Sequence, residues 1–297
     1  MRNLIMCTAV LLAAVLTSSV CAEWTTPVPV ASGINTQFAE WTPYLSYDGQ
    51  SLYFTRGYTS DDFYFHVYEA KRSQPAGPFT SVSKVYSPSY HAFGPWVSPD
   101  NLRMYYWHEL PSDWRVEVSQ RASVNDPWSE GTPINLGSVA NPCAPSLSSD
   151  ELTMVFNTPS GPGGWDMYLA TRPNINLPFD NIRSLTELNT AGADGRPFLS
   201  PDALSIYWNN GEHILEATRS SLSDPFGNTQ ILSALDMPGR VNGHPAISSD
   251  GTAIYFTSSL SGQPSDIYVS YNVPEPATLL LFGLGAVMFI RKREKSL

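Results

Sequence analysis

One pattern of apolar and polar positions recurs five times along the chain. Each copy begins with proline, continues through a short apolar segment and a Ser-x-Asp stretch, and ends in an apolar and aromatic run. Because Asp can accept a hydrogen bond from the backbone two residues further on, the centre of each copy predicts a tight turn. The run that follows predicts a buried strand. The five copies span residues 43–54, 95–106, 145–156, 197–208 and 245–256.

Each copy is followed by further segments that predict a third and a weaker fourth strand. The third strands are expected at 64–70, 114–119, 166–171, 213–218 and 266–271. Four strands in a repeat of about 50 residues are typical of a β-propeller blade. The sequence therefore predicts an all-β, five-bladed propeller of four-stranded blades over residues 23–272. Its repeats are placed near 40–90, 91–140, 141–192, 193–240 and 241–272.

The fifth repeat ends before a fourth strand, and the N-terminus supplies a segment that can replace it. Residues 23–31 resemble 127–135, which are expected to hold the fourth strand of the second repeat. We expect residues 24–31 to pair with the last blade and close the ring, which removes exposed sheet edges. The repeat, Pro-x-Leu-Ser-x-Asp-Gly-x-x-Leu-Tyr-Phe in consensus, is similar to the TolB-type, WD40-like propeller repeat of bacterial envelope proteins.

The first 22 residues predict a secretory signal peptide. A basic start precedes an apolar run over 4–16, and Val20-Cys21-Ala22 suits cleavage after Ala22. An uncleaved membrane anchor, or lipidation at Cys21, remains an alternative.

The C-terminal segment 273–297 combines a Pro-Glu-Pro motif, a short apolar run over 277–290 and a basic cluster. The run is shorter than the roughly 20 residues that usually cross a bilayer, and the basic cluster favours the cytoplasmic side. This order resembles the bacterial PEP-CTERM sorting signal. The resemblance implies a short membrane helix at 277–290, a sorting enzyme of the exosortase type, and passage through the inner membrane to the cell surface or extracellular matrix. A plain membrane anchor is the alternative. The matching residues are Pro274, Glu275, Pro276, Arg291, Lys292 and Arg293.

Charge and cysteine content exclude several classes of function. Of 17 Lys+Arg and 27 Asp+Glu residues, 12 and 25 fall within residues 23–272, so this part has a net charge of −13. Such an acidic domain is not expected to bind nucleic acid. Cys143 is the only cysteine beyond residue 22, so an internal disulfide is not expected there. The sequence predicts neither a cofactor nor a metal site.

Residues that recur in every repeat are expected to be structural, and residues that differ between repeats are better functional candidates. The turn aspartates recur: Asp48, Asp100, Asp150, Asp202 and Asp250. The positions just before the repeated prolines differ, and we expect them near one mouth of the central channel. These candidates are Glu40, His91, Asp194, Arg196 and His244.

The candidates favour a non-enzymatic module that binds a protein or glycan partner at the cell envelope. An extracellular, polysaccharide-active glycosidase of the five-bladed propeller type stays open as the alternative. It would need two carboxylates in the channel. The sequence offers Glu40 and Asp194 for these roles, with Glu109 as a third.

Overall fold

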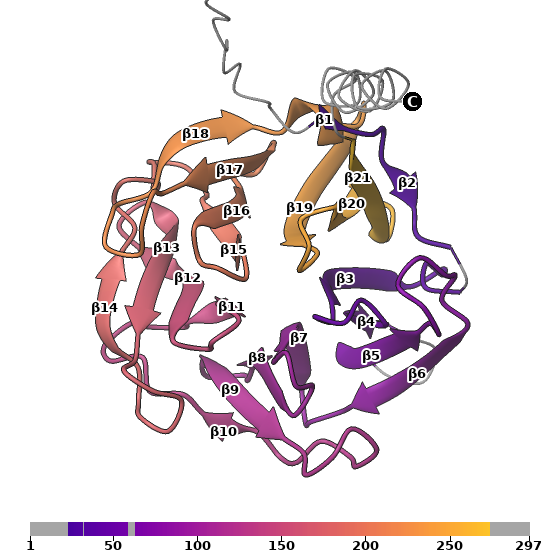
Figure 1. Cartoon of the computed structure of the whole chain (residues 1–297), viewed down its shortest axis with the longest axis horizontal. Coiled ribbons are helices and arrows are strands. Elements are labelled where there is room, and N and C mark those ends of the chain that lie inside the picture. The colour runs from indigo at the N-terminus through magenta and orange to yellow at the C-terminus, as the bar shows by residue number, and fades with distance from the viewer. Residues whose placement is uncertain (1–22, 32, 59–62, 274–297) are drawn as a thin grey trace, which may run out of the picture. The chain divides into compact units, whose positions relative to one another are not determined.

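A computed structural model describes residues 23–31, 33–58 and 63–273, and Figure 1 views it down the propeller axis. Antiparallel sheets follow one another around a ring, and each forms one blade. The prediction of an all-β, five-bladed propeller is confirmed. The predicted signal peptide and the predicted helix at 277–290 lie outside the described residues. Within these ranges, no helix is long and apolar enough to cross a membrane.

The blades run in chain order, with the innermost strand first in blades one to four. Blade one contains β3 (Ala39–Leu45), β4 (Ser51–Gly57), β5 (His66–Lys71) and β6 (Ser81–Tyr86). Blade two contains β7 (His91–Val97), β8 (Arg103–Glu109), β9 (Trp114–Gln120) and β10 (Thr132–Pro133). Blade three contains β11 (Cys143–Leu147), β12 (Thr153–Gly161), β13 (Gly164–Thr171) and β14 (Asp180–Ser184). Blade four contains β15 (Gly195–Leu199), β16 (Ser205–Asn209), β17 (Ile214–Thr218) and β18 (Gly227–Ile231).

The fifth blade joins both ends of the ring. It contains β19 (Arg240–Ile247), β20 (Ala253–Leu260) and β21 (Asp266–Val273), preceded by a short 3-10 helix at Ser233–Leu235. The N-terminal strands β1 (Glu23–Trp24) and β2 (Val28–Pro29) pair with β21. Thr25 N donates to Tyr271 O and Val30 N donates to Ile267 O, both at 2.9 Å. Closure by the N-terminal strand is therefore confirmed.

The repeated Ser-x-Asp turns share one geometry, shown here by the third blade. Asp150 Oδ1 accepts hydrogen bonds from Ser148 Oγ at 2.5 Å and from Leu152 N at 3.0 Å. The next residue, Glu151, has a φ of 60°, which closes the turn. Such a turn needs a short side chain that accepts hydrogen bonds, not a charge. The same two bonds form at Asp48, Asp100, Asp202 and Asp250.

An arginine ties each of the first four turns to the edge of its blade. In blade four, Arg219 Nε donates to Ala203 O at 2.8 Å, and its guanidinium lies 4.5 Å from the centre of the Phe226 ring. A guanidinium over an aromatic face gains both stacking and cation–π attraction. The sequence placed these residue types at fixed spacing, and the structure shows that they touch. The other pairs are Arg72–Phe79, Arg121–Trp128 and Arg172–Phe179.

Candidate functional site

The five innermost strands bend toward the propeller axis at the residue before each repeated proline. All five strands carry a register shift at this position, so the side chain there is turned toward the centre. The φ angles at these positions lie between 49° and 59°, in the left-handed region that side-chain-bearing residues rarely adopt. The five residues are Thr42, Gly94, Ala144, Arg196 and His244.

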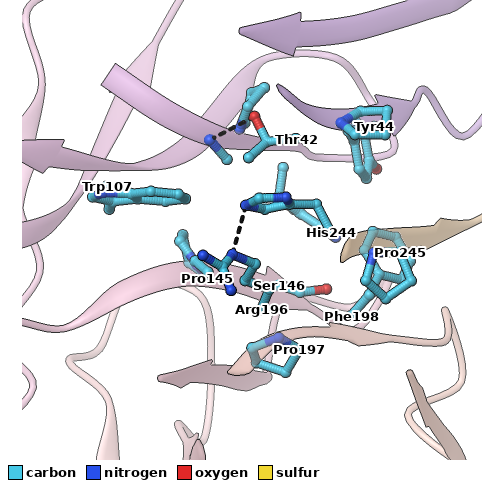
Figure 2. A pocket seen from close by; sticks show the side chains of 15 residues that line it. Thr42, Tyr44, Trp107, Pro145, Ser146, Arg196, Pro197, Phe198, His244 and Pro245 are labelled. Carbon is cyan, nitrogen blue, oxygen red and sulfur yellow. Dashed lines mark hydrogen bonds between the residues drawn. The ribbon is translucent and has the colours of Figure 1, made fainter. Parts of the chain in front are cut away.

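These residues line a small hollow at one end of the channel, shown in Figure 2. Its floor is aromatic: the Tyr44 ring centre lies 5.9 Å from that of Trp96 and 6.1 Å from that of Phe198. Because these rings come from blades one, two and four, they fill the centre of the ring. We call the hollow above them the central pocket. A second hollow, on the other side of these three rings, lies at the opposite end of the inner strands and includes Tyr47.

Arg196 and His244 meet inside the central pocket. Arg196 Nε and His244 Nε2 are 2.8 Å apart (Figure 2). Since a guanidinium only donates, Nε2 must accept, and the imidazole proton sits on Nδ1. Nδ1 then donates to Thr257 Oγ1 at 2.9 Å, and that hydroxyl donates to Gly243 O at 2.9 Å. Each side chain in this series of hydrogen bonds therefore has one defined orientation.

Burial lowers the pKa of His244 well below its usual 6.5, and the positive charge of Arg196 lowers it further. The imidazole is therefore neutral at physiological pH and does not compete with Arg196 for an anion. Burial also lowers the pKa of Arg196, which nevertheless stays protonated because a free guanidinium has a pKa above 12. The central pocket thus holds one positive charge.

The predicted acidic candidates hold loops between blades. Glu40 is fully buried and accepts from Thr36 Oγ1 at 2.6 Å and from Arg56 Nε at 2.8 Å. Asp194 accepts from Thr190 Oγ1 at 2.7 Å and from the Trp208 indole at 3.2 Å. Neither carboxylate lines the central pocket. Their hydrogen-bond partners are protein groups that fix the chain entering β3 and β15.

The remaining candidates lie behind the pocket wall or beside it. His91 Nδ1 accepts from Phe65 N at 3.1 Å, and the His91 ring stacks on Phe93 at 5.5 Å. Glu109 is half-buried at the end of β8, and burial raises its pKa. The structure therefore brings Arg196 and His244 together and places Glu40, His91 and Asp194 elsewhere. Cys143 is buried, and burial raises the pKa of its thiol.

Further aromatic side chains lie next to the central pocket, and the sequence analysis did not select Trp41, Trp114 or Trp165 as candidates. Trp41 stacks on His244 at 5.8 Å, Phe93 stacks on Trp107 at 4.8 Å, and Trp165 lies 6.0 Å from Trp114. We call Trp41, Trp107, Trp114 and Trp165 the aromatic rim. One signal was available: repeats one and two carry Trp41 and Phe93 two residues before the proline, where the other repeats carry Cys143, Gly195 and Gly243.

No group of three or more potential metal-ligating side chains gathers anywhere in the part of the chain that the structure describes. The pocket lining offers two ionisable groups that can contact a ligand directly, the Arg196 guanidinium and the His244 imidazole, besides the Tyr44 hydroxyl that is bonded to Val97 O.

The C-terminal end matches a known sorting signal. Residues 272–293 match the PEP-CTERM protein-sorting motif, which confirms the resemblance seen in the sequence. This motif implies export, processing by an exosortase and sorting to the cell surface. No curated protein matches the chain in sequence.

Solved structures similar to this chain include two glycosidases and a TolB protein. Zg3597, a family 117 glycoside hydrolase from Zobellia galactanivorans, is 13% identical, with 86% of this chain and 93% of that chain covered and a TM-score of 0.60. The α-L-arabinofuranosidase from Lactobacillus brevis is 14% identical, with 80% and 92% covered and a TM-score of 0.57. The putative TolB from Agrobacterium tumefaciens is 17% identical, with 79% and 77% covered and a TM-score of 0.47. At these identities the two glycosidases share the fold alone.

Proposed function

We propose that this chain is an exosortase-sorted propeller, displayed at the cell surface, that binds glycans in its central pocket without cleaving them. The observation that carries the proposal is the pocket itself. It combines an aromatic floor and rim with one pair of polar groups, Arg196 and His244. Ligand sites typically have this composition, with apolar walls and a few placed polar groups that set orientation.

Sugars suit such a surface for a physical reason. The C–H faces of a pyranose ring are apolar and pack flat against aromatic rings, while its hydroxyl groups seek polar partners. The half-buried rim residues Trp41, Trp114 and Trp165 offer aromatic surface next to the pocket. Indole rings also bury a large area while losing little side-chain freedom, which favours them at binding surfaces.

A glycosidase is the second candidate, because two glycoside hydrolases share the fold. Retaining and inverting enzymes both need a pair of carboxylates beside the scissile bond. The lining of the central pocket supplies an arginine and a histidine in place of such a pair. Glu40 and Asp194 are instead bonded to Thr36 and Thr190. This arrangement favours binding over hydrolysis.

The test is a glycan array probed with the full chain, purified in mild detergent. Two variants, each of which replaces one aromatic side chain by alanine, serve as a matched pair. Trp165→Ala removes part of the rim beside Arg196, whereas Tyr47→Ala removes an exposed aromatic ring at the opposite end of the inner strands. We expect binding that Trp165→Ala weakens and Tyr47→Ala leaves unchanged.

Binding that responds equally to both changes, or an array without any bound glycan, would contradict the proposal. Release of reducing sugar from a bound glycan would favour the glycosidase instead. That assay is run on the glycans that the array selects, so that binding and cleavage are measured on the same compounds.

A further inference from the structure

Arg196 differs from the other arginines of the propeller in what accepts its hydrogen bonds. Arg56, for comparison, donates to a carboxylate of Glu40 at 2.8 Å, and Arg219 donates to the carbonyl of Ala203. The side chain of Arg196 donates to an imidazole nitrogen of His244. Among the described residues, no carboxylate forms an ion pair with it. The positive charge of Arg196 is therefore without a counter-charge in this part of the chain.

Arg196 is half-buried, and a charge withdrawn from water without a partner is unfavourable, so proteins normally pair such charges or use them. The bond to His244 occupies Nε and orients the guanidinium within the pocket (Figure 2). Both Nη atoms have no acceptor in the described ranges, so four N–H donors remain. The Trp165 ring, whose centre lies 5.6 Å from Arg196 Cζ, packs against the guanidinium from another blade. Arg196 is thus positioned in advance for an acceptor that the described residues do not supply.

The wall facing this pair carries no charged side chain. Gly94 and Ala144 occupy the equivalent positions in blades two and three, and the Trp107 ring fills the space that a side chain at position 94 would take. Thr42, the equivalent residue of blade one, is tied back by Thr55 Oγ1 at 2.9 Å and by Gly94 N at 3.1 Å. The five repeats therefore give the pocket one cationic side and one uncharged side.

We propose that the central pocket recognises an acidic glycan, whose uronic-acid carboxylate accepts hydrogen bonds from the Nη groups of Arg196. A guanidinium edge matches the two oxygens of a carboxylate, and such charge-assisted pairs are strong and directional. A single negative charge balances the single positive charge of the pocket. The sugar ring would rest against the aromatic and proline wall. This inference rests on the proposed function, because it names the class of glycan that the same pocket binds.

The first experiment asks which glycans bind. The full chain in mild detergent is applied to an array that carries uronic-acid oligosaccharides, their methyl esters, sulfated oligosaccharides and neutral oligosaccharides. The methyl esters keep the sugar and remove the charge, so each pair isolates the carboxylate. We expect binding to uronic-acid oligosaccharides and at least about a ten-fold loss for each methyl ester.

The second experiment changes Arg196 itself. Arg196→Gln removes the charge but keeps an amide that can donate to His244, and we expect about 100-fold weaker binding of the selected acidic glycan. Arg196→Lys keeps the charge but lacks the paired N–H donors of the guanidinium, and we expect an intermediate loss of affinity. Arg240→Gln is the control, because Arg240 bonds to Ser258 and stacks on Tyr268 away from the pocket. Thermal melting of each variant establishes that it is folded.

The outcomes separate the two proposals. Binding confined to neutral glycans overturns the acidic ligand and leaves the glycan-binding function standing. Binding confined to sulfated glycans overturns the inference that the group bound by Arg196 is a carboxylate. Acidic-glycan binding that Arg196→Gln leaves unchanged, in a variant that melts normally, overturns the role of Arg196. The absence of any bound glycan overturns the proposed function and this inference together.

Discussion

Replacing Trp24 by alanine should destabilise the propeller strongly, because Trp24 anchors the strand that closes the ring. The side chain is 7% exposed and packs in the main apolar core, although it lies 249 positions in sequence from Val273, the last residue of β21. Truncating a buried Trp typically costs about 3–5 kcal/mol. For a domain of this size each kcal/mol corresponds to about 2–4 °C in melting temperature. We therefore expect the melting temperature to fall by about 6–20 °C.

The assay is thermal unfolding of the full chain, followed by circular dichroism or calorimetry. Val28→Ala is the matched control: Val28 lies on the same closing segment, is 49% exposed, and should change stability by no more than about 0.5 kcal/mol. Amide hydrogen exchange should also speed up first in β21, whose outer edge the segment covers, and later in β16. If Trp24→Ala melts within a degree or two of the unmodified chain, the N-terminal strand does not hold the ring closed and the reasoning fails.

Three further predictions concern the turns, the pH dependence and the tail. Asp150→Asn should cost less than about 1 kcal/mol and Asp150→Leu about 1–3 kcal/mol, measured by urea unfolding, because Asn still accepts the bonds from Ser148 and Leu152; equal effects would contradict this account of the turn. The hydrogen bond to Glu117 raises the pKa of His108 above its usual 6.5, so this stabilisation is complete below that pH and is lost as the pH rises through the folded-state pKa. His108→Gln should therefore lower the free energy of unfolding more at about pH 5.5 than at about pH 9. A larger loss at about pH 9 than at about pH 5.5 would refute the ion pair. Glu275→Ala, or deletion of 291–295, should leave unprocessed precursor, measured by mass spectrometry of the C-terminal peptide; recovery of an intact Leu297 terminus from surface-released, unmodified protein would contradict processing and favour a plain anchor.

The repeats made the fold predictable from the sequence. Five copies of one strand–turn–strand pattern constrain the number of blades, and the likeness between residues 23–31 and 127–135 indicated which strand closes the ring. Each blade repeats the same strand–turn–strand pattern, so the structure assigned to one copy supports the same assignment in the others. The contact between Arg219 and Phe226 depended on how the loop between them folds back, and spacing alone did not give it.

The candidate site was harder to predict, because the direction of a side chain depends on a bulge of one residue. Arg196 and His244 immediately precede a proline and point into the pocket, whereas Asp194, two residues before Arg196, turns into a loop. The sequence does contain a sign of this difference. Glu40 and Asp194 each follow a threonine by four positions, and both threonines bond to the carboxylate. That spacing is typical of a local loop contact.

A crystal structure of the full chain with the tightest-binding glycan from the array would test the proposed ligand site directly. We expect the sugar to occupy the central pocket, with a carboxylate within hydrogen-bond distance of the Arg196 Nη atoms and a ring face against the aromatic rim. A glycan bound on the outer edge of a blade, or at the opposite hollow near Tyr47, would overturn the assignment of the central pocket as the binding site.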